Sequence, residues 1–247
     1  MSRIVYGKRA VEEALRHSPG GLAKLYLDSG KRQIFKPVAD LARSLGLEPL
    51  WVSHEEIDKV CRHTKHQGIA AMLADFQFTS VKDFVSKKAE KARVAVALDS
   101  VTDPQNLGAC LRAAGAFGAD LVVIPERRSA TITPVVSKAS AGATEVVAVA
   151  REVNLTRALQ SLKQNGFWIY GLDPNGAQPL SAAPMNKDVV LVLGSEGSGL
   201  HRLVAEQCDY LVHLSAAGPI ESLNVAQACA VGLYEIFRRR AEQAATP

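Results

Sequence analysis

The sequence is poor in cysteine, and its cysteines form no motif. They stand singly, with no C-x-x-C pair, at Cys61, Cys110, Cys208 and Cys229. This spacing argues against a disulfide framework and against a thiolate zinc site, so we expect reduced and mostly buried thiols. Cys61, His63 and His66 do form a C-x-H-x-x-H cluster. Because no fourth ligand lies nearby in the sequence, we expect no metal centre.

Long apolar runs are also missing. The runs at residues 94–98 and 189–193 stop after five residues, whereas a membrane-spanning helix needs roughly 20. The N-terminal stretch MSRIVYGKRAVEEALRHS carries acidic residues among its apolar ones and has no continuous apolar core of the kind found in signal peptides. With 47% hydrophobic and 22% charged residues, the composition is that of an ordinary globular protein. We expect a cytoplasmic protein that contacts no membrane.

The net charge of +4 over 247 residues is unevenly distributed along the chain. Residues 1–92 contain 16 Lys or Arg and 11 Asp or Glu, while residues 93–247 contain 13 and 14. Between these halves, the segment 77–92 becomes polar and rich in lysine, which is typical of a linker. We therefore predict two domains, residues 1–76 and 93–247, joined by a linker at 77–92.

Hydrophobic spacing predicts an α/β fold in both domains. Residues 1–76 show helical spacing at Val11, Ala14 and Leu15, a second helix at 38–45, and the strand-like segments KLYLD and PLWVS, followed by QGIAAMLADF. After residue 93, short β-rich runs alternate with helical patterns, which is the signature of a parallel sheet covered by helices. These runs lie at residues 94–98, 121–124, 146–149, 167–171 and 189–193. The last helix is predicted to begin near Ser222, a plausible N-cap.

Ligands of an open parallel sheet bind outside the carboxyl ends of its strands, and the first loop at that edge is DSVTDPQNLGACLRAAGAFG. Asn106 and Arg112 lie six residues apart on an incipient helix there. Asn106 is either an N-cap or a functional amide. Arg112 lies among Ala, Leu and Gly with no nearby acid, and an arginine in such a place often binds a phosphate or carboxylate with its planar fork.

The second loop, GSEGSGL, has Gly194, Gly197 and Gly199 around Glu196. Glycines at this density allow positive φ and a close approach of backbone to a ligand. Their order, G-x-x-G-x-G with a carboxylate inside, differs from the dinucleotide fingerprint and disfavours NAD, and no Walker A motif occurs. A purely structural tight turn is the alternative.

The third segment is HLSAAGPIESLNVAQACAVGLYE, in which an apolar strand ends at Leu214 and Ser222-Leu223-Asn224 opens a helix. Free N–H groups at that helix start, with the side chains of Ser222 and Asn224, can hydrogen-bond a polar ligand. A mere N-cap at Ser222 is compatible with this role.

Together the segments DPQNLGACLRAAGAFG, LVLGSEGSGL and SLNVAQACAVGLYE resemble, in order and spacing, the three motifs of the SpoU (TrmH) family of SPOUT RNA 2′-O-methyltransferases. IVYGKRAVEEAL and HQGIAA at 66–71 resemble the small N-terminal substrate-binding domain of family members that methylate 23S rRNA. The resemblance therefore covers nearly the whole chain.

This resemblance implies a C-terminal SPOUT α/β domain with a parallel sheet and a trefoil knot, preceded by a small α/β domain of the ribosomal protein L30e-like type. It implies S-adenosyl-L-methionine as cofactor, held by backbone groups around Gly194, Leu214 and Leu223, with Ser222 and Asn224 lining the pocket. The residues that match the family's catalytic positions are Asn106, Arg112, Glu196, Ser222 and Asn224.

The implied reaction is 2′-O-ribose methylation of a guanosine in 23S rRNA by a homodimer, with RNA rather than DNA as partner. A tRNA substrate, or a non-catalytic RNA-binding protein with this fold, is the alternative, while a nicotinamide oxidoreductase is disfavoured by the glycine order. The basic N-terminal half fits a grip on RNA phosphates, although a solvated surface charge is an alternative for each residue. The candidates are Arg3, Lys8, Arg9, Lys31, Arg32, Lys36, Arg62, Lys65 and His66.

Overall fold

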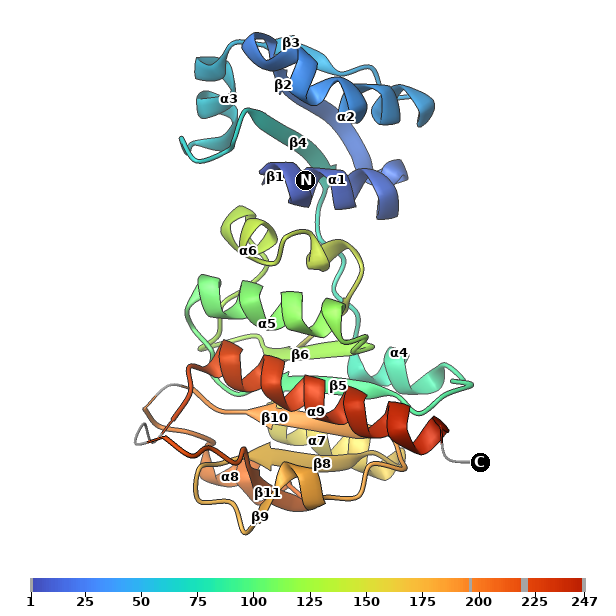
Figure 1. Cartoon of the computed structure of the whole chain (residues 1–247), viewed down its shortest axis with the longest axis vertical. Coiled ribbons are helices and arrows are strands. Elements are labelled where there is room, and N and C mark those ends of the chain that lie inside the picture. Colours follow the sequence, from blue (N-terminus) through green and yellow to red (C-terminus); the bar gives the residue numbers. More distant parts are fainter. Residues whose placement is uncertain (1, 196, 219–221, 246–247) are drawn as a thin grey trace. The chain divides into compact units, whose positions relative to one another are not determined.

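The computed structural model describes residues 2–195, 197–218 and 222–245 (Figure 1). The chain divides into two compact units, each with its own core. Unit 1 comprises Met1–Gln77 and Ile132–Val146, and unit 2 comprises Phe78–Thr131 and Val147–Pro247. Within the described part of the chain, no helix has the length and apolar character needed to cross a membrane.

Unit 1 is built on a four-stranded sheet with the order β1-β4-β2-β3, in which β4 is antiparallel to β1 and β2, and β2 is parallel to β3. The apolar faces of its first two helices share one core cluster with the sheet, including Val11, Leu15, Val38, Leu25 and Leu27. Its elements are β1 (Ser2–Tyr6), α1 (Lys8–His17), β2 (Leu22–Asp28), α2 (Arg32–Ser44), β3 (Leu50–Val52), α3 (His54–Cys61), β4 (Ile69–Ala74) and α6 (Pro134–Ala139).

The segment 132–146 packs with unit 1 although it comes from the second half of the sequence. Arg3 on β1 donates to both carboxylate oxygens of Glu145 at 2.8 Å, and the Glu145 side chain is only 2% exposed. Such a bidentate pair is strong because both partners are charged and their planar groups match. The predicted domains, residues 1–76 and 93–247, are each one continuous stretch of chain, and this division stays a prediction.

Unit 2 is built on a seven-stranded sheet with the order β7-β6-β5-β10-β8-β11-β9, and all its strand pairs are parallel. Its strands are β5 (Val94–Leu98), β6 (Leu121–Pro125), β7 (Ala148–Glu152), β8 (Trp168–Leu172), β9 (Gln178–Pro179), β10 (Val189–Leu193) and β11 (Tyr210–His213). Its helices are α4 (Val81–Ser86), α5 (Pro104–Ala116), α7 (Leu155–Gln164), α8 (Arg202–Ala205) and α9 (Val225–Ala245).

Helices cover both faces of this sheet, as the continuous apolar strands require. β5 and β10 lie at its centre, and every residue of both is buried. On one face, α4 and α7 share a core cluster with alternate strand residues. On the other, α5 packs beside α9. Gly232 lets α9 approach the sheet closely, because a Cβ there would lie 2.8 Å from Leu191 Cδ2.

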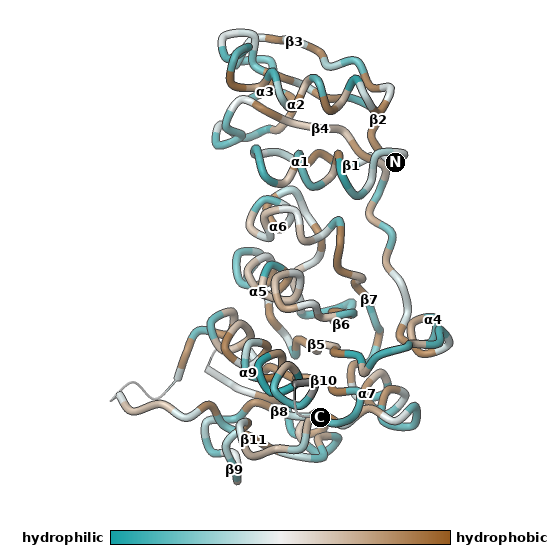
Figure 2. Tube along the Cα trace, turned by 45° about the vertical axis from the view of Figure 1, so that its right-hand side comes forward, coloured by the Kyte–Doolittle hydropathy of each residue, from teal (hydrophilic) through white to brown (hydrophobic). Residues whose placement is uncertain are grey.

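The structure confirms the predicted α/β class and corrects some boundaries. β7 begins at Ala148 rather than residue 146, because Val146 closes a short 3₁₀ turn and is 50% exposed. Residues 77–92, predicted as a linker, contain α4, and the lysine-rich stretch after that helix is hydrophilic in Figure 2. The trefoil knot stays a prediction.

Candidate active site

Two predicted site residues from distant parts of the sequence meet in unit 2. Asn224 Nδ2 donates a hydrogen bond to Asn106 Oδ1 at 3.0 Å, across 118 residues of chain. Asn106 lies in the first turn of α5, and Asn224 directly precedes α9. The packing of α5 beside α9 therefore brings the first and third sequence motifs together.

The caps of these two helices decide between alternatives that the sequence left open. Asp103 caps α5 by accepting from Gln105 N at 2.9 Å, so Asn106 is not the cap. Asn224 Oδ1 accepts from Ala226 N at 2.8 Å and caps α9. The predicted N-cap at Ser222 is therefore wrong: this residue lies before the helix and is exposed.

Arg112 also lies on α5, but its exposed side chain is displaced from Asn106. Six residues of α-helix correspond to about 9 Å along the axis and a rotation that leaves the two side chains about 120° apart. Among the described residues, Arg112 is in no ion pair. The guanidinium is thus available to a ligand from solvent, as the lack of neighbouring acids predicted.

The glycine-rich loop after β10 is a tight, self-bonded turn. Ser195 N donates to Gly199 O at 3.1 Å, and Gly199 N donates to Ser195 O at 3.0 Å. Gly199 has φ of +64°, a conformation that favours glycine. At Gly194, a Cβ would lie 2.1 Å from the Gly199 backbone, so only glycine fits. Glu196, the carboxylate predicted inside this loop, lies outside the described residues.

The remaining predicted cofactor residues follow β11. Leu214 comes directly after that strand and is half-buried, whereas Ser222, Leu223 and Asn224 are exposed. Because β5, β10, β8 and β11 are parallel neighbours, the segments after β5, β10 and β11 all emerge at the same edge of the sheet. This is the edge where parallel sheets bind ligands.

Sequence reasoning missed Asp99, which directly follows β5 at that same edge. The residue is 4% exposed, and its carboxylate accepts from His201 N at 2.8 Å, with His201 Nδ1 3.0 Å away. An aspartate after a buried strand was a visible signal, because a buried carboxylate needs dedicated partners. Those partners come from beyond the glycine loop, so only the fold reveals them.

Cys208 and Cys229 of unit 2 lie in surroundings that disfavour a thiolate. Burial raises the pKa of the Cys208 thiol to about 12. A hydrogen bond with Cys110, together with burial, raises the pKa of Cys229 well above its usual value. Because the thiolate is the reactive form, these two thiols are weak nucleophiles.

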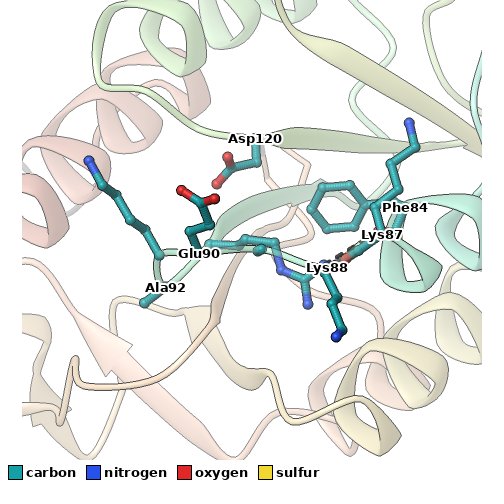
Figure 3. A pocket seen from close by; sticks show the side chains of 9 residues that line it. Phe84, Lys87, Lys88, Glu90, Ala92 and Asp120 are labelled. Carbon is teal, nitrogen blue, oxygen red and sulfur yellow. Dashed lines mark hydrogen bonds between the residues drawn. The ribbon is translucent and has the colours of Figure 1, made fainter.

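An open pocket lies at the opposite edge of the sheet, before β5 and β6 (Figure 3). Two of its charged residues, Arg93 and Asp120, hold the starts of the strands. Asp120 Oδ2 accepts from Val94 N at 2.8 Å, and Arg93 Nε donates to Asp188 Oδ2 at 2.8 Å while its guanidinium stacks on Phe84. None of the predicted site residues that the structure describes lines this pocket.

In unit 1, the C-x-H-x-x-H cluster does not assemble as a group. The groups that do approach one another are His54, Asp58 and His66. His66 is fully buried, with Nδ1 accepting from Gly68 N at 3.0 Å and Nε2 donating to Asp58 at 2.9 Å. Both ring nitrogens are thus committed. His66 cannot reach an RNA phosphate, which corrects its place among the RNA-contact candidates.

The other candidate cations of unit 1 fall into two groups. Arg3 is bound to Glu145, Lys36 to Asp40, and Arg32 lies over the Trp51 ring, while Lys31 lies 3.9 Å from Asp28. Four others are exposed and, within the part of the chain that the structure describes, in no ion pair. These four are Lys8, Arg9, Arg62 and Lys65.

Two family models match the chain, one in its N-terminal part and one in its C-terminal part. The model of the SpoU rRNA Methylase family matches residues 93–234. The model of RNA 2'-O ribose methyltransferase substrate binding matches residues 4–79. The first of these contains Asn106, Arg112 and Asn224.

Similar proteins carry related names. The chain is 38% identical to the 23S rRNA (guanosine-2'-O-)-methyltransferase RlmB of Coxiella burnetii, over 97% of this chain and 98% of that protein. It is 40% identical to an uncharacterized tRNA/rRNA methyltransferase of Synechocystis sp., covering 96% of this chain but only 62% of that protein. The SpoU methyltransferase AviRb of Streptomyces viridochromogenes, solved with AdoMet, has a TM-score of 0.80 at 22% identity, over 98% of this chain and 91% of that one. This last likeness shows the fold.

Proposed function

The chain belongs to the SpoU rRNA methylase family, and we propose that it methylates the ribose 2′-oxygen of a guanosine in 23S rRNA. It is an RNA methyltransferase that uses S-adenosylmethionine. The observation that carries the proposal is the Asn224–Asn106 hydrogen bond, which joins two motifs at the ligand-binding edge of the sheet. The match to RlmB over almost its whole length supports the guanosine of 23S rRNA as substrate.

The residues at this edge fit the cofactor. Gly194 tolerates no side chain because the Gly199 backbone lies against it, and this close packing keeps the backbone of the turn after β10 at the edge where parallel sheets bind ligands. Leu223 is 46% exposed and offers apolar surface to an adenine ring. Backbone groups at Gly194, Leu214 and Leu223 would hold the cofactor, with Ser222, Asn224 and Glu196 around it, inside the bend of a trefoil knot.

S-adenosylmethionine supplies an electrophilic methyl group on its sulfonium. The protein's own task is to hold the ribose 2′-oxygen in line with that methyl and to manage one proton. The coupled amides of Asn106 and Asn224 present fixed donors and acceptors at this place, so they are suited to orienting a ribose hydroxyl.

Arg112 is assigned the role of a phosphate clamp rather than that of a base. A guanidinium keeps its proton at physiological pH and presents a planar fork that matches phosphate oxygens. The exposed position of Arg112 on α5 leaves that fork open to RNA. In this scheme the clamped phosphate accepts the hydroxyl proton or passes it to water.

A homodimer is part of the proposal. On α9, Val231, Tyr234 and Phe237 are each about half exposed, and the Phe117 ring lies 5.9 Å from Tyr234 and 6.4 Å from Phe237. A continuous aromatic face of this kind suits a self-complementary interface across a two-fold axis. The enzyme would work in the cytoplasm, where rRNA is made and assembled in bacteria.

Unit 1 is proposed to grip the RNA. Its matching family model describes substrate binding, and its exposed cations Lys8, Arg9, Arg62 and Lys65 can neutralise phosphates. The name of the Synechocystis relative includes tRNA as well as rRNA, so tRNA is the second candidate substrate.

Labelled methyl transfer to 23S rRNA fragments and to bulk tRNA tests the proposal. We expect incorporation into one 23S rRNA fragment and none into tRNA. The labelled guanosine should have a 3′ linkage that resists alkali, because a 2′-O-methyl group blocks cleavage. Efficient labelling of tRNA alone would replace the rRNA assignment with the second candidate, and no labelling of any RNA would support a non-catalytic RNA-binding protein.

A further inference from the structure

Asp99 is bonded to both ends of the glycine-rich loop 194–200. Its backbone N–H donates to Leu193 O at 2.8 Å, directly before the loop. Its carboxylate accepts from His201 N at 2.8 Å, directly after the loop, and lies 3.0 Å from His201 Nδ1. Asp99, which follows the neighbouring strand β5, is thus hydrogen-bonded to the residues on both sides of the loop.

The burial of Asp99 makes this arrangement specific. The side chain is 6% exposed, and the only other side-chain contact described for its carboxylate is with Ser100 Oγ at 3.3 Å. A buried carboxylate is costly unless hydrogen bonds compensate it, and bonds to an ionised acceptor are stronger than neutral ones. The hydrogen bonds that compensate the buried Asp99 carboxylate therefore also hold His201, and with it the end of the loop, in place.

The described residues of this loop are bonded to one another or packed on the sheet. The Ser195 and Gly199 backbones bond to each other, and Gly194 lies against Gly199. Leu200, next to His201, packs against the sheet core. A shift at His201 would consequently be transmitted to Gly194, the residue proposed to hold the cofactor through its backbone.

We infer that Asp99 is a positioning residue for cofactor binding, acting through His201 to hold the loop 194–200 in its binding conformation. This inference rests on the proposed cofactor site and adds a residue to it. The carboxylate of Asp99 is bonded to His201 and Ser100, so its proposed effect on the cofactor is indirect. Its removal should weaken cofactor binding while leaving the binding of RNA unchanged.

The chain contains a matched control at the other end of the same two strands. Asp188 precedes β10 and accepts from Arg93 N at 2.7 Å and from Arg93 Nε at 2.8 Å, which ties the start of β10 to the start of β5. Asp99 and Asp188 thus make equivalent bonds at opposite edges of the sheet. Asp99→Asn and Asp188→Asn each remove one carboxylate charge, but only Asp99 touches the loop.

Calorimetric titration of the full-length protein with S-adenosylhomocysteine tests the inference. We expect Asp99→Asn to raise the dissociation constant about tenfold, because a bond to a charged acceptor becomes a bond to a neutral one. Asp188→Asn should leave it within about twofold, even where both variants lower the melting temperature. Equal affinities of Asp99→Asn and wild type would overturn the inference, and so would equal losses in the two variants.

A second pair of variants separates positioning from general stability. His201→Ala keeps the backbone bond to Asp99 but loses the ring, so a loss of about threefold is expected. His201→Asn can again donate to Asp99 from its amide and should restore affinity. Failure of the asparagine to restore binding, with both variants folded, counts against the inference. If the wild type binds no S-adenosylhomocysteine at all, the proposed cofactor itself fails.

Discussion

Unit 1 and unit 2 hold their charged groups in different ways. By the division that the structure shows, unit 1 carries a net charge of +3 and unit 2 a net charge of +1. The contrast of +5 and −1 between residues 1–92 and 93–247 is sharper, because several lysines of the predicted linker belong to unit 2. The total charge of a unit is therefore a weak guide to its task.

The units differ in how their candidate functional groups are held. In unit 1, four of the candidate cations contact an acidic or aromatic neighbour, and four others are exposed without an ion pair among the described residues. In unit 2, the candidate site has one exposed cation, Arg112, one buried anion, Asp99, and a pair of coupled amides. RNA affinity should thus depend on a few side chains of unit 1, and catalysis on geometry in unit 2.

The largest effect is expected at Arg112. Arg112→Ala should lower kcat about 10²- to 10³-fold, by analogy with the removal of one preorganised charge-stabilising group, and leave cofactor affinity unchanged. Arg112→Lys should keep part of the activity, because a lysine can still attract the phosphate. Single-turnover methyl transfer measures both variants. A completely inactive lysine variant that still binds RNA would contradict the clamp.

The amide pair should show energetic coupling. Asn106→Ala and Asn224→Ala are each expected to lower kcat/KM by about tenfold or more, and the double variant should lose less than the product of the two. The reason is that each amide orients the other through their hydrogen bond. A double-mutant cycle on methyl transfer measures this coupling. Strictly multiplicative losses would show that the two amides act independently.

These site residues illustrate what the sequence can and cannot predict. Strands β5 and β10 were predicted at their observed bounds, because continuous apolar runs bounded by polar loops are unambiguous. The family motifs placed Asn106 and Asn224 in one site, but their contact was not predicted, since no local pattern links residues 118 positions apart. Asp99 and its partner His201 were missed for the same reason.

Unit 1 shows a second kind of limit. Its helices α1 and α2 were predicted from their apolar spacing, whereas α3 has a single buried residue, Ile57, and gave little periodic signal. The segment 132–146 was assigned with its neighbours in sequence, yet it packs with β1 through Glu145. Discontinuous units cannot be recognised from composition, because composition is read along the chain.

The proposed dimer interface lies on α9 of unit 2. Substitutions there should weaken dimerisation without changing the folding of unit 1. Tyr234→Glu with Phe237→Glu places two carboxylates on the aromatic face of α9, so self-association should weaken by about 30-fold or more. Light scattering after size exclusion measures the mass in solution. The matched variant Leu211→Glu changes another exposed apolar residue, on β11. A dimer that survives the α9 changes but not Leu211→Glu would move the interface to that strand.

The smallest effect is expected in the RNA grip. Lys8→Glu with Arg9→Glu should weaken binding of the 23S rRNA fragment by about tenfold and flatten its salt dependence, because fewer phosphates are neutralised. Cofactor affinity should stay the same. Lys87→Glu with Lys88→Glu, two exposed lysines of unit 2 before β5, is the control because it changes the net charge by the same amount. Equal losses in the control would show that RNA responds only to total charge.

The central claim is that the site around Asn106, Asn224 and Arg112 methylates a ribose. The most direct measurement is nucleoside analysis by mass spectrometry of the 23S rRNA fragment after reaction with wild type and with Arg112→Ala. We expect 2′-O-methylguanosine with wild type and almost none with the variant. A methyl group on a base, or undiminished 2′-O-methylguanosine with Arg112→Ala, would contradict it.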